Sequence, residues 1–469
     1  MSQSAVAVAA AGTATLSPRT RLLLEGPVAE TLLRLAAPNV LVMVLQAAVS
    51  TLDAVFVGWL GSDALAGVSL VFPLAMLMQT MSAGGMGGGV ASAVARALGG
   101  GRRADADALV GHAFVVALVM AASFTLLLGL GGPALYRAMG GTDAVLESAV
   151  LYSRVVFGGA LAYWLFNTLG SVIRGTGNMA LPASVMVGSG LLYLALSPAL
   201  ILGWGPLPRL GIAGAAAASV ASFSLGSLAL LGFLFSGRSL VRPTLRGLQF
   251  RRTLFWEILR VGAPGSLNTI LTNLTVVLLT SLVGPFGAAA LAGYGMGARL
   301  EYLQIPIVFG LGTGLVTMVG TSVGAGDHAR ALRVAWVGAA MAAGITGAIG
   351  ILGALFPHAW LGLFTADPEV LAAGTRYLRI VGPCYGFFGV GLALYFASQG
   401  AGRLLWPLLA GFTRLVVAGA GGWLATRGLD GGLSGLFAAM AVALVILGII
   451  NVAAIRLGAW GIHRNRRAS

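Results

Sequence analysis

Long apolar segments, separated by short polar connections, run through almost the whole chain. They lie near residues 34–58, 64–98, 109–135, 148–173, 180–203, 211–235, 261–284, 288–323, 334–357, 377–400, 404–426 and 433–456. A helix of about 20 apolar residues crosses the hydrocarbon core of a bilayer, whereas a transmembrane strand needs only about 10 alternating residues. The pattern therefore predicts an all-α integral membrane protein with twelve transmembrane helices.

The composition supports the same interpretation. Of the 469 residues, 58% are hydrophobic and only 9% are charged, whereas a soluble domain carries about 25% charged residues. The only cysteine is Cys384, which rules out an intramolecular disulfide. Four scattered histidines and isolated acids argue against a membrane enzyme, so we expect no catalytic residue, no bound metal and no cofactor.

The basic residues indicate the orientation in the membrane. The net charge is +14, and all 28 basic residues are arginines. They gather in alternate connections and above all in the segment 236–260, as expected for loops on the cytoplasmic side. This pattern favours a multi-pass protein of the bacterial inner membrane with both termini in the cytoplasm, and it makes nucleic-acid binding unnecessary as an explanation of the charge.

The two halves of the chain repeat each other. LRLAAP at 33–38 recurs as LRVGAP at 259–264, and VGxxGxxALAG at 57–67 recurs at 283–293, both with an offset of 226. GxG at 175–177 recurs at 400–402 with an offset of 225. A near-constant offset indicates a duplicated unit, and six helices per unit make the repeat parallel. We expect an N-terminal tail (1–30), a first lobe (31–235), a basic linker (236–260), a second lobe (261–456) and a C-terminal tail (457–469).

Two acids lie within predicted spans, Asp53 and Glu301. A carboxylate in a membrane is costly and is by default a functional candidate. Asn39, Gln46 and Asp53 are spaced by seven, and Ser50 precedes Asp53 by three, so the four share one helix face. Burial there favours the neutral acid and suits proton exchange. The alternative is that Asp53 lies at the outer end of its helix in water.

The second half differs at the corresponding positions. The repeat partner of Asp53 is Leu279, and only Asn268, Thr272 and Thr275 form a polar stripe there. Ion coupling is therefore predicted to belong to the first lobe.

Arg299 and Glu301 lie two positions apart, on different helix faces, and cannot pair well with each other. Either they form a substrate or coupling site in the second lobe, or the predicted eighth helix begins near Tyr302 and both lie at its outer edge.

Several motifs together resemble the multidrug and toxic compound extrusion (MATE) family. They are Pro38, DxxxVGxxGxxxLA from 53, RGTGxxxxP at 174–182 and VGxxxGAGxxxRA at 319–331. The resemblance covers roughly residues 30–456. It implies a V-shaped pair of six-helix lobes, drug export driven by inward proton or sodium movement, and a first helix that bends near Pro38.

One stretch departs from the family pattern. Members with an acidic first helix usually carry Asn-x-x-x-Asp-Pro late in the fifth helix, where this chain has Tyr193, Ser197 and Pro198. A hydroxyl at Ser219 matches the family's threonine on the sixth helix. The resemblance thus implies an ion-coupling site made of Asp53, Gln46, Ser50, Tyr193, Ser197 and Ser219.

Polar and aromatic positions within the predicted helices are the candidates for substrate binding. They are Asn39, Asn167, Asn268, Thr272, Arg299, Glu301, Tyr395 and Gln399. We expect a monomeric antiporter that exports amphipathic or cationic organic compounds in exchange for protons, with the small-molecule substrate, the proton and the bilayer as its partners. Sodium coupling in the same fold and a flippase for lipid-linked precursors are the alternatives.

Overall fold

The computed structural model describes residues 17–243, 249–428 and 431–461, and all regular structure in these ranges is helical. The first half contains α2 (Pro18–Glu25), α3 (Val28–Gly58), α4 (Ser62–Thr80), η1 (Met81–Met86), α5 (Gly87–Gly99), α6 (Arg103–Ala138), α7 (Asp143–Gly158), α8 (Ala160–Gly175), α9 (Ala180–Leu202) and α10 (Ile212–Phe235). The second half contains α11 (Arg252–Val283), η2 (Gly284–Phe286), α12 (Ala288–Gly324), α13 (His328–Leu355), α14 (Pro357–Leu361), α15 (Pro368–Val381), η3 (Gly382–Cys384), α16 (Tyr385–Ala401), α17 (Leu405–Val416), η4 (Val417–Gly421), α18 (Gly422–Arg427) and α19 (Gly432–Arg456).

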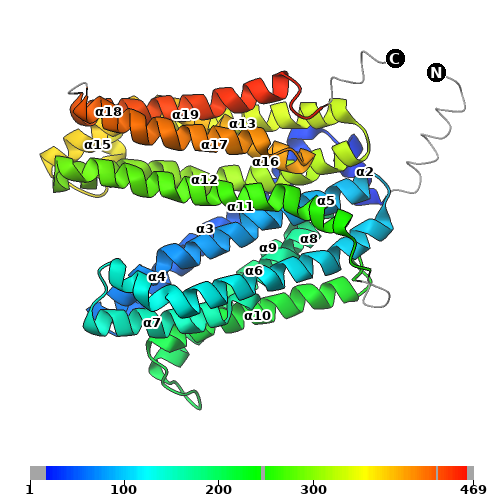
Figure 1. Cartoon of the computed structure of the whole chain (residues 1–469), viewed down its shortest axis with the longest axis horizontal. Coiled ribbons are helices and arrows are strands. Elements are labelled where there is room, and N and C mark those ends of the chain that lie inside the picture. Colours follow the sequence, from blue (N-terminus) through cyan, green and yellow to red (C-terminus); the bar gives the residue numbers. More distant parts are fainter. Residues whose placement is uncertain (1–16, 244–248, 429–430, 462–469) are drawn as a thin grey trace, which may run out of the picture.

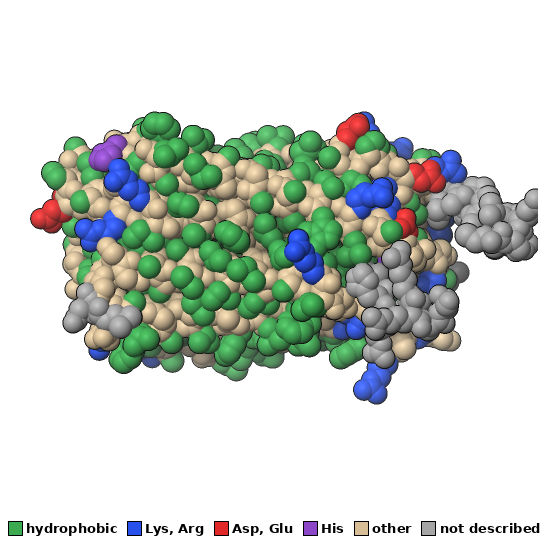
Figure 2. Space-filling view, turned by 90° about the horizontal axis from the view of Figure 1, so that it is seen from above, with side chains coloured by type: hydrophobic (Ala, Val, Ile, Leu, Met, Phe, Trp, Pro, Cys, Tyr) green, Lys and Arg blue, Asp and Glu red, His purple; other side chains and the backbone are tan. Residues whose placement is uncertain are grey.

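The helices account for the predicted membrane spans. Within the described ranges, 11 continuous helical stretches are long and apolar enough to cross a membrane, and α7 with α8, which meet at a 44° bend, supplies another. Leu126, Leu127 and Leu130 of α6 face outward, with 62%, 71% and 83% of their surface exposed. Figure 2 shows hydrophobic side chains over the middle of one face, with most charged side chains at its two ends. The prediction of an all-α, twelve-span membrane protein is confirmed.

The two halves form two lobes arranged as a V. Figure 1 shows the helices of the first half in one layer and α12–α19 in the other; the layers meet at the end where α2 lies and diverge toward the opposite end. The first long helix of each half, α3 or α11, also contacts the other lobe: α3 packs on α12, and α11 packs on α5. We call the end where the lobes meet the convergent end.

The convergent end is built symmetrically. Leu32 of α3 joins a buried cluster with Leu311 and Leu315 of α12. Ile258 of α11 joins a cluster with Val90 of α5. Leu32 and Ile258 are both fully buried and occupy equivalent repeat positions, 226 apart. Each lobe therefore anchors the first helix of the other through the same apolar contact.

Glycines bring α5 and α12 into backbone contact at this end. A Cβ on Gly99 would lie 2.1 Å from the carbonyl oxygen of Thr321, and a Cβ on Gly324 would lie 2.1 Å from that of Arg96. Because backbone atoms cannot move aside as a side chain can, any larger residue at Gly99 or Gly324 would push the lobes apart.

An ion-pair network crosses the same contact, and we call it the Arg96 latch. Arg96 is only 4% exposed. Its Nη2 donates to Oε2 of Glu257 at 2.9 Å, and its Nη1 donates to the carbonyl oxygen of Gly400 at 3.1 Å. Arg260 Nη2 donates to the same Glu257 oxygen at 2.7 Å. Arg96 belongs to the first lobe and its partners to α11 and α16, so the latch ties the two lobes together.

Glu257→Gln should destabilise the protein by about 3 kcal/mol, because it leaves the buried Arg96 guanidinium without its carboxylate. We expect the thermal unfolding midpoint of the purified transporter to fall by several degrees. The matched control is Arg102→Gln, which breaks an ion pair with Asp105 in which Arg102 is 53% exposed and which should contribute little. Equal shifts for the two variants would show that the latch is no stronger than a surface pair.

Candidate ion-coupling and substrate sites

Asp53 lies near the end of α3 and faces α9. The Tyr193 hydroxyl donates a hydrogen bond to Asp53 Oδ1. Ser197, one turn further along α9, donates to the Tyr193 hydroxyl at 3.5 Å. Asp53 is half-buried, whereas Tyr193 and Ser197 are buried. The two residues that replace the family's amide and carboxylate therefore form a chain of hydroxyls that ends on the Asp53 carboxylate.

The remaining surroundings of Asp53 are aromatic and uncharged. Tyr152 of α7 and Tyr163 of α8 lie within electrostatic range of the carboxylate. Ser219 of α10 is hydrogen-bonded to the Tyr163 hydroxyl at 2.5 Å, and among the described residues it makes no hydrogen bond to Asp53. In the part of the chain that the structure describes, Asp53 has no basic partner within ion-pair distance.

The other positions of the α3 polar face lie elsewhere. Gln46 is half-buried and Ser50 is exposed, and within the described residues neither is hydrogen-bonded to Asp53. Asn39 Nδ2 donates to Thr313 Oγ1 of α12 at 2.9 Å, across the lobe boundary. Pro38 lies inside α3, which continues through it. The polar face of α3 therefore contributes Asn39 to the lobe contact near the start of the helix and carries Asp53 near its end.

Glu301 lies in a different electrostatic setting. Arg414 Nη2 is 3.5 Å from Glu301 Oε1, and the Tyr377 hydroxyl donates to Oε2 at 3.2 Å. These residues line a cavity of about 30 Å³ inside the second lobe. Because α12 begins at Ala288, the interpretation that this helix begins near Tyr302 is wrong. Sequence reasoning missed Arg414, although an arginine within the apolar segment 404–426 was a usable signal.

The two lobes keep a tyrosine at the same place beside their acids. Tyr152 and Tyr377 are 225 positions apart, which is the repeat offset. Tyr152 lies close enough to Asp53 for the charge of the carboxylate to act on its hydroxyl, and Tyr377 donates a hydrogen bond to Glu301. The acid comes from the first long helix in one lobe and from α12 in the other. The lobes have therefore diverged in where the acid is attached and in whether an arginine neutralises it.

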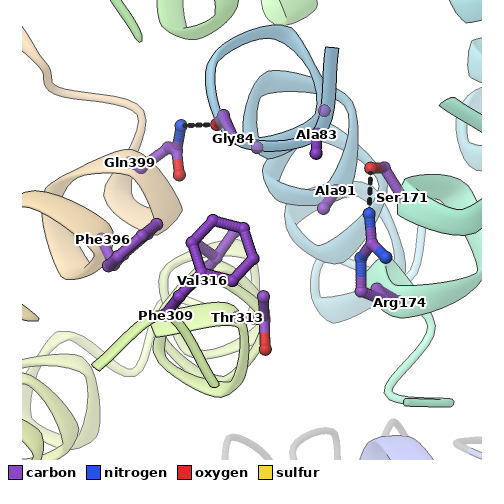
Figure 3. A pocket seen from close by; sticks show the side chains of 12 residues that line it. Ala83, Gly84, Ala91, Ser171, Arg174, Phe309, Thr313, Val316, Phe396 and Gln399 are labelled. Atoms are coloured by element: carbon purple, nitrogen blue, oxygen red, sulfur yellow. Dashed lines mark hydrogen bonds between the residues drawn. The ribbon is translucent and has the colours of Figure 1, made fainter. Parts of the chain in front are cut away.

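A small cavity lies between the lobes near the convergent end. Its volume is about 20 Å³, enough for about one water molecule. Figure 3 shows Arg174 of the first lobe on one side and Gln399 of the second lobe on the other, with Phe309 and Phe396 forming an aromatic wall. We call this space the inter-lobe cavity.

The inter-lobe cavity lies on the axis that relates the two halves. Several of its lining residues are repeat partners, at offsets of 225 or 226: Arg174 with Gln399, Ser171 with Phe396, Gly87 with Thr313, and Ala83 with Phe309. A molecule bound here would touch equivalent positions of both lobes. In each of these four pairs, the two lobes present different side chains to it.

The amide of Gln399 is only partly satisfied. The side chain is fully buried, and its Nε2 donates to the carbonyl oxygen of Gly84 at 2.9 Å, across the lobes. Its Oε1 has no hydrogen-bond partner among the described residues. Asn167 donates to Ser82 Oγ at 2.8 Å, and Tyr395 packs edge-on against Phe396 at 5.3 Å between ring centroids. Neither Asn167 nor Tyr395 is among the residues that line the cavity.

The other predicted substrate-binding residues lie away from the inter-lobe cavity. Arg299 is exposed and places its guanidinium 5.4 Å from the centre of the Phe364 ring. The side chain of Asn268 contacts α17: the Asn268 Oδ1 lies so close to Gly411 that a Cβ added there would be 2.4 Å from it. Thr272 is exposed and donates to the backbone carbonyl of Asn268 at 2.9 Å. The structure therefore brings only Gln399 of the predicted set to the cavity wall and adds Arg174.

Two repeated helical lobes around a shared axial cavity define a polytopic membrane transporter. The MatE family model matches the chain twice, over residues 38–199 and 264–424, and the chain belongs to this family. The matches start 226 residues apart, the interval at which the motifs recur. As a member of the MATE multidrug efflux family, the chain is a transporter rather than an enzyme.

Known relatives and solved structures are similar over most of their length. The Probable multidrug resistance protein YoeA of Bacillus subtilis is 30% identical over 79% of this chain and 81% of its own. The FAD transporter of Shewanella oneidensis is 26% identical over 91% and 94%. A crystal structure of MATE in the bent conformation is 25% identical and covers 96% of this chain and 99% of its own, with a TM-score of 0.89.

A MOP superfamily transporter from Pyrococcus furiosus has a TM-score of 0.87, at 25% identity over 96% of this chain and all of its own. A binding pocket of reverse polarity is reported for that transporter. The V-shaped pair of lobes implied by the family resemblance is confirmed.

Glu301→Gln should destabilise the protein by about 3 kcal/mol, because Arg414 then lacks its carboxylate in a site where both side chains are at most 15% exposed. We expect equal losses of export for cationic and neutral compounds, and partial recovery of thermal stability when Arg414→Gln is added. The control is Arg299→Gln, whose exposed side chain has no acid partner among the described residues. Selective loss of cation export at unchanged stability would instead place Glu301 on the substrate.

Proposed function

We propose that this transporter exports amphipathic organic compounds, cationic ones included, in exchange for protons. The observation that carries the proposal is the environment of Asp53: one carboxylate, a hydroxyl chain through Tyr193 and Ser197, and no basic partner within the described residues. Such a group can take up a proton when it faces the outer solution and release it when its surroundings change.

The same environment argues against sodium. A hard cation needs several oxygen ligands to replace its water. The Tyr193 hydroxyl is already committed as a donor to Asp53, and Ser219 is bonded to Tyr163 instead. The second acid offers no better site, because a cation at Glu301 would have to displace Arg414. Proton binding needs only the one titratable oxygen.

The names of two relatives support organic substrates, and one of these names, that of the FAD transporter, supports an aromatic, charge-bearing molecule. One is named for multidrug resistance and another for FAD transport. The aromatic wall of Phe309 and Phe396, whose rings meet at 90° with centroids 5.5 Å apart, offers ring faces and edges to such a molecule. The cavity has room for about one water with the lobes in contact, so the substrate would occupy these walls after the lobes part at the convergent end.

Proton coupling is tested with purified transporter in liposomes under independently imposed gradients. A pH gradient alone, acidic on the side of the divergent lobe ends, should drive transport of a cationic dye against its concentration gradient. A sodium gradient at fixed pH should drive none, because Asp53 lacks the ligands for sodium. Empty liposomes control for passive dye partitioning. Transport driven by sodium alone, without a response to the pH gradient, would contradict the proposal.

We further propose that the convergent end faces the cytoplasm of a bacterial cell, so that the conformation described is open to the outside. In a Cys384→Ala background, Arg238→Cys after α10 should resist an impermeant thiol reagent in intact cells, whereas Thr142→Cys before α7 should be labelled. The two positions lie at opposite ends of the lobes. The reverse labelling pattern would invert the orientation.

A further inference from the structure

Arg174 is a cation without an acid. It lies in the last turn of α8 and lines the inter-lobe cavity, where its Nη2 donates to Ser171 Oγ at 2.7 Å. In the described ranges no carboxylate lies within ion-pair distance of it. By contrast, Arg96 pairs with Glu257 and Arg414 pairs with Glu301. Arg174 is thus a partly buried guanidinium that has only a neutral hydroxyl as a side-chain partner.

The rest of the cavity wall leaves this charge uncompensated. The lining consists of apolar, glycine, hydroxyl and amide groups, and neither Asp53 nor Glu301 is part of it. A basic residue in the last turn of a helix is favoured by the helix dipole, which explains a positive charge at the end of α8 but does not supply a counter-ion. Since an unpaired charge away from water is costly, the site is suited to an anion.

The geometry also limits what the anion is attached to. A guanidinium has five N–H donors and prefers carboxylate or phosphate oxygens, often through two parallel hydrogen bonds. Figure 3 shows Arg174 and Ser171 on one side of the cavity and the rings of Phe309 and Phe396 on the other. A ligand that satisfied both sides would be an aromatic molecule carrying an acidic group.

We propose that Arg174 is the anion-binding residue of the transport pathway, and that the substrates include aromatic compounds bearing a phosphate or a carboxylate. The inference rests on the proposed export function for its use in transport. The repeat partner of Arg174 is Gln399, which offers an unpartnered amide oxygen instead of a charge. The first lobe therefore holds the acidic group, and the second lobe receives the neutral part of the molecule.

The test is direct binding of a matched pair of fluorescent ligands, flavin mononucleotide and riboflavin, which share a ring system and differ by one phosphate. Purified transporter in nanodiscs of zwitterionic lipid should bind the phosphorylated ligand at least about tenfold more tightly, as expected for hydrogen bonds to a charged group. Arg174→Gln should remove this difference, chiefly by weakening binding of the phosphorylated ligand, and Arg174→Lys should keep part of it. Arg102→Gln, an exposed arginine, is the control.

Two further arms separate the sources of the anion. Nanodiscs containing anionic lipid test for a lipid headgroup, and added inorganic phosphate tests for a free ion. Anionic lipid or phosphate can compete with the flavin for the site. Such competition supports the proposal as long as the tenfold preference is measured in zwitterionic discs. The proposal would be overturned if the transporter showed no preference for the phosphorylated flavin in zwitterionic discs, and if only anionic lipid or free phosphate raised its thermal midpoint in a way that depends on Arg174. Equal binding of the two flavins by a folded wild-type protein would do so as well.

The outcome is independent of proton coupling. Proton-driven export of a cationic dye without any difference between the flavins would remove the Arg174 site and leave the antiporter intact. An Arg174-dependent preference in a protein that does not respond to a pH gradient would do the opposite. If Arg174→Gln does not fold, as judged by its thermal midpoint, the Arg174→Lys series and the wild-type comparison still decide the proposal.

Discussion

Lipid offers no partner to a charge, and the interior of this transporter is organised by that constraint. Arg96 and Arg414 each face a carboxylate, and these pairs lie where shape must be kept: the first across the lobe contact, the second inside the second lobe. Asp53 and Arg174 have only hydroxyls beside them within the described residues. The two interior charges that we propose for the proton and for an anionic substrate are therefore ones without an ionic partner in the described residues.

The duplicated architecture explains how one chain separates these tasks. Equivalent positions anchor the lobes through Leu32 and Ile258, so the convergent end keeps the symmetry of the repeat. The candidate functional positions do not keep this symmetry. Tyr152 and Tyr377 are still equivalent, but only the acid beside Tyr377 has acquired an arginine. Because of this divergence, Asp53 of the first lobe has no basic partner in the described residues, whereas Glu301 of the second lobe is paired with Arg414.

Much of the fold could be read from the sequence, because the constraints of the bilayer act on long stretches of the chain. The spans and the offset of 226 depend on apolar length and on recurring glycine and proline positions. That Tyr193 and Ser197 lie beside Asp53 was implied only by their place in the family pattern. Arg414 carries a local signal, since it is an arginine within an apolar segment, but its pairing with Glu301 depends on which helices pack together. The place of Arg174 on the cavity wall depends on helix packing in the same way. Residue type alone predicts Asn268 and Arg299 as substrate-binding residues, but helix packing places both away from the inter-lobe cavity.

The central claim is that Asp53 alone exchanges the coupling proton. Proton release on substrate binding measures this directly, with purified transporter in weakly buffered solution, a pH-sensitive dye and a cationic substrate. The account predicts that wild-type protein releases protons when substrate is added, that Asp53→Asn binds substrate without releasing any, and that Asp63→Asn, an exposed acid at the start of α4, behaves like the wild type. Wild-type proton release by Asp53→Asn would contradict it.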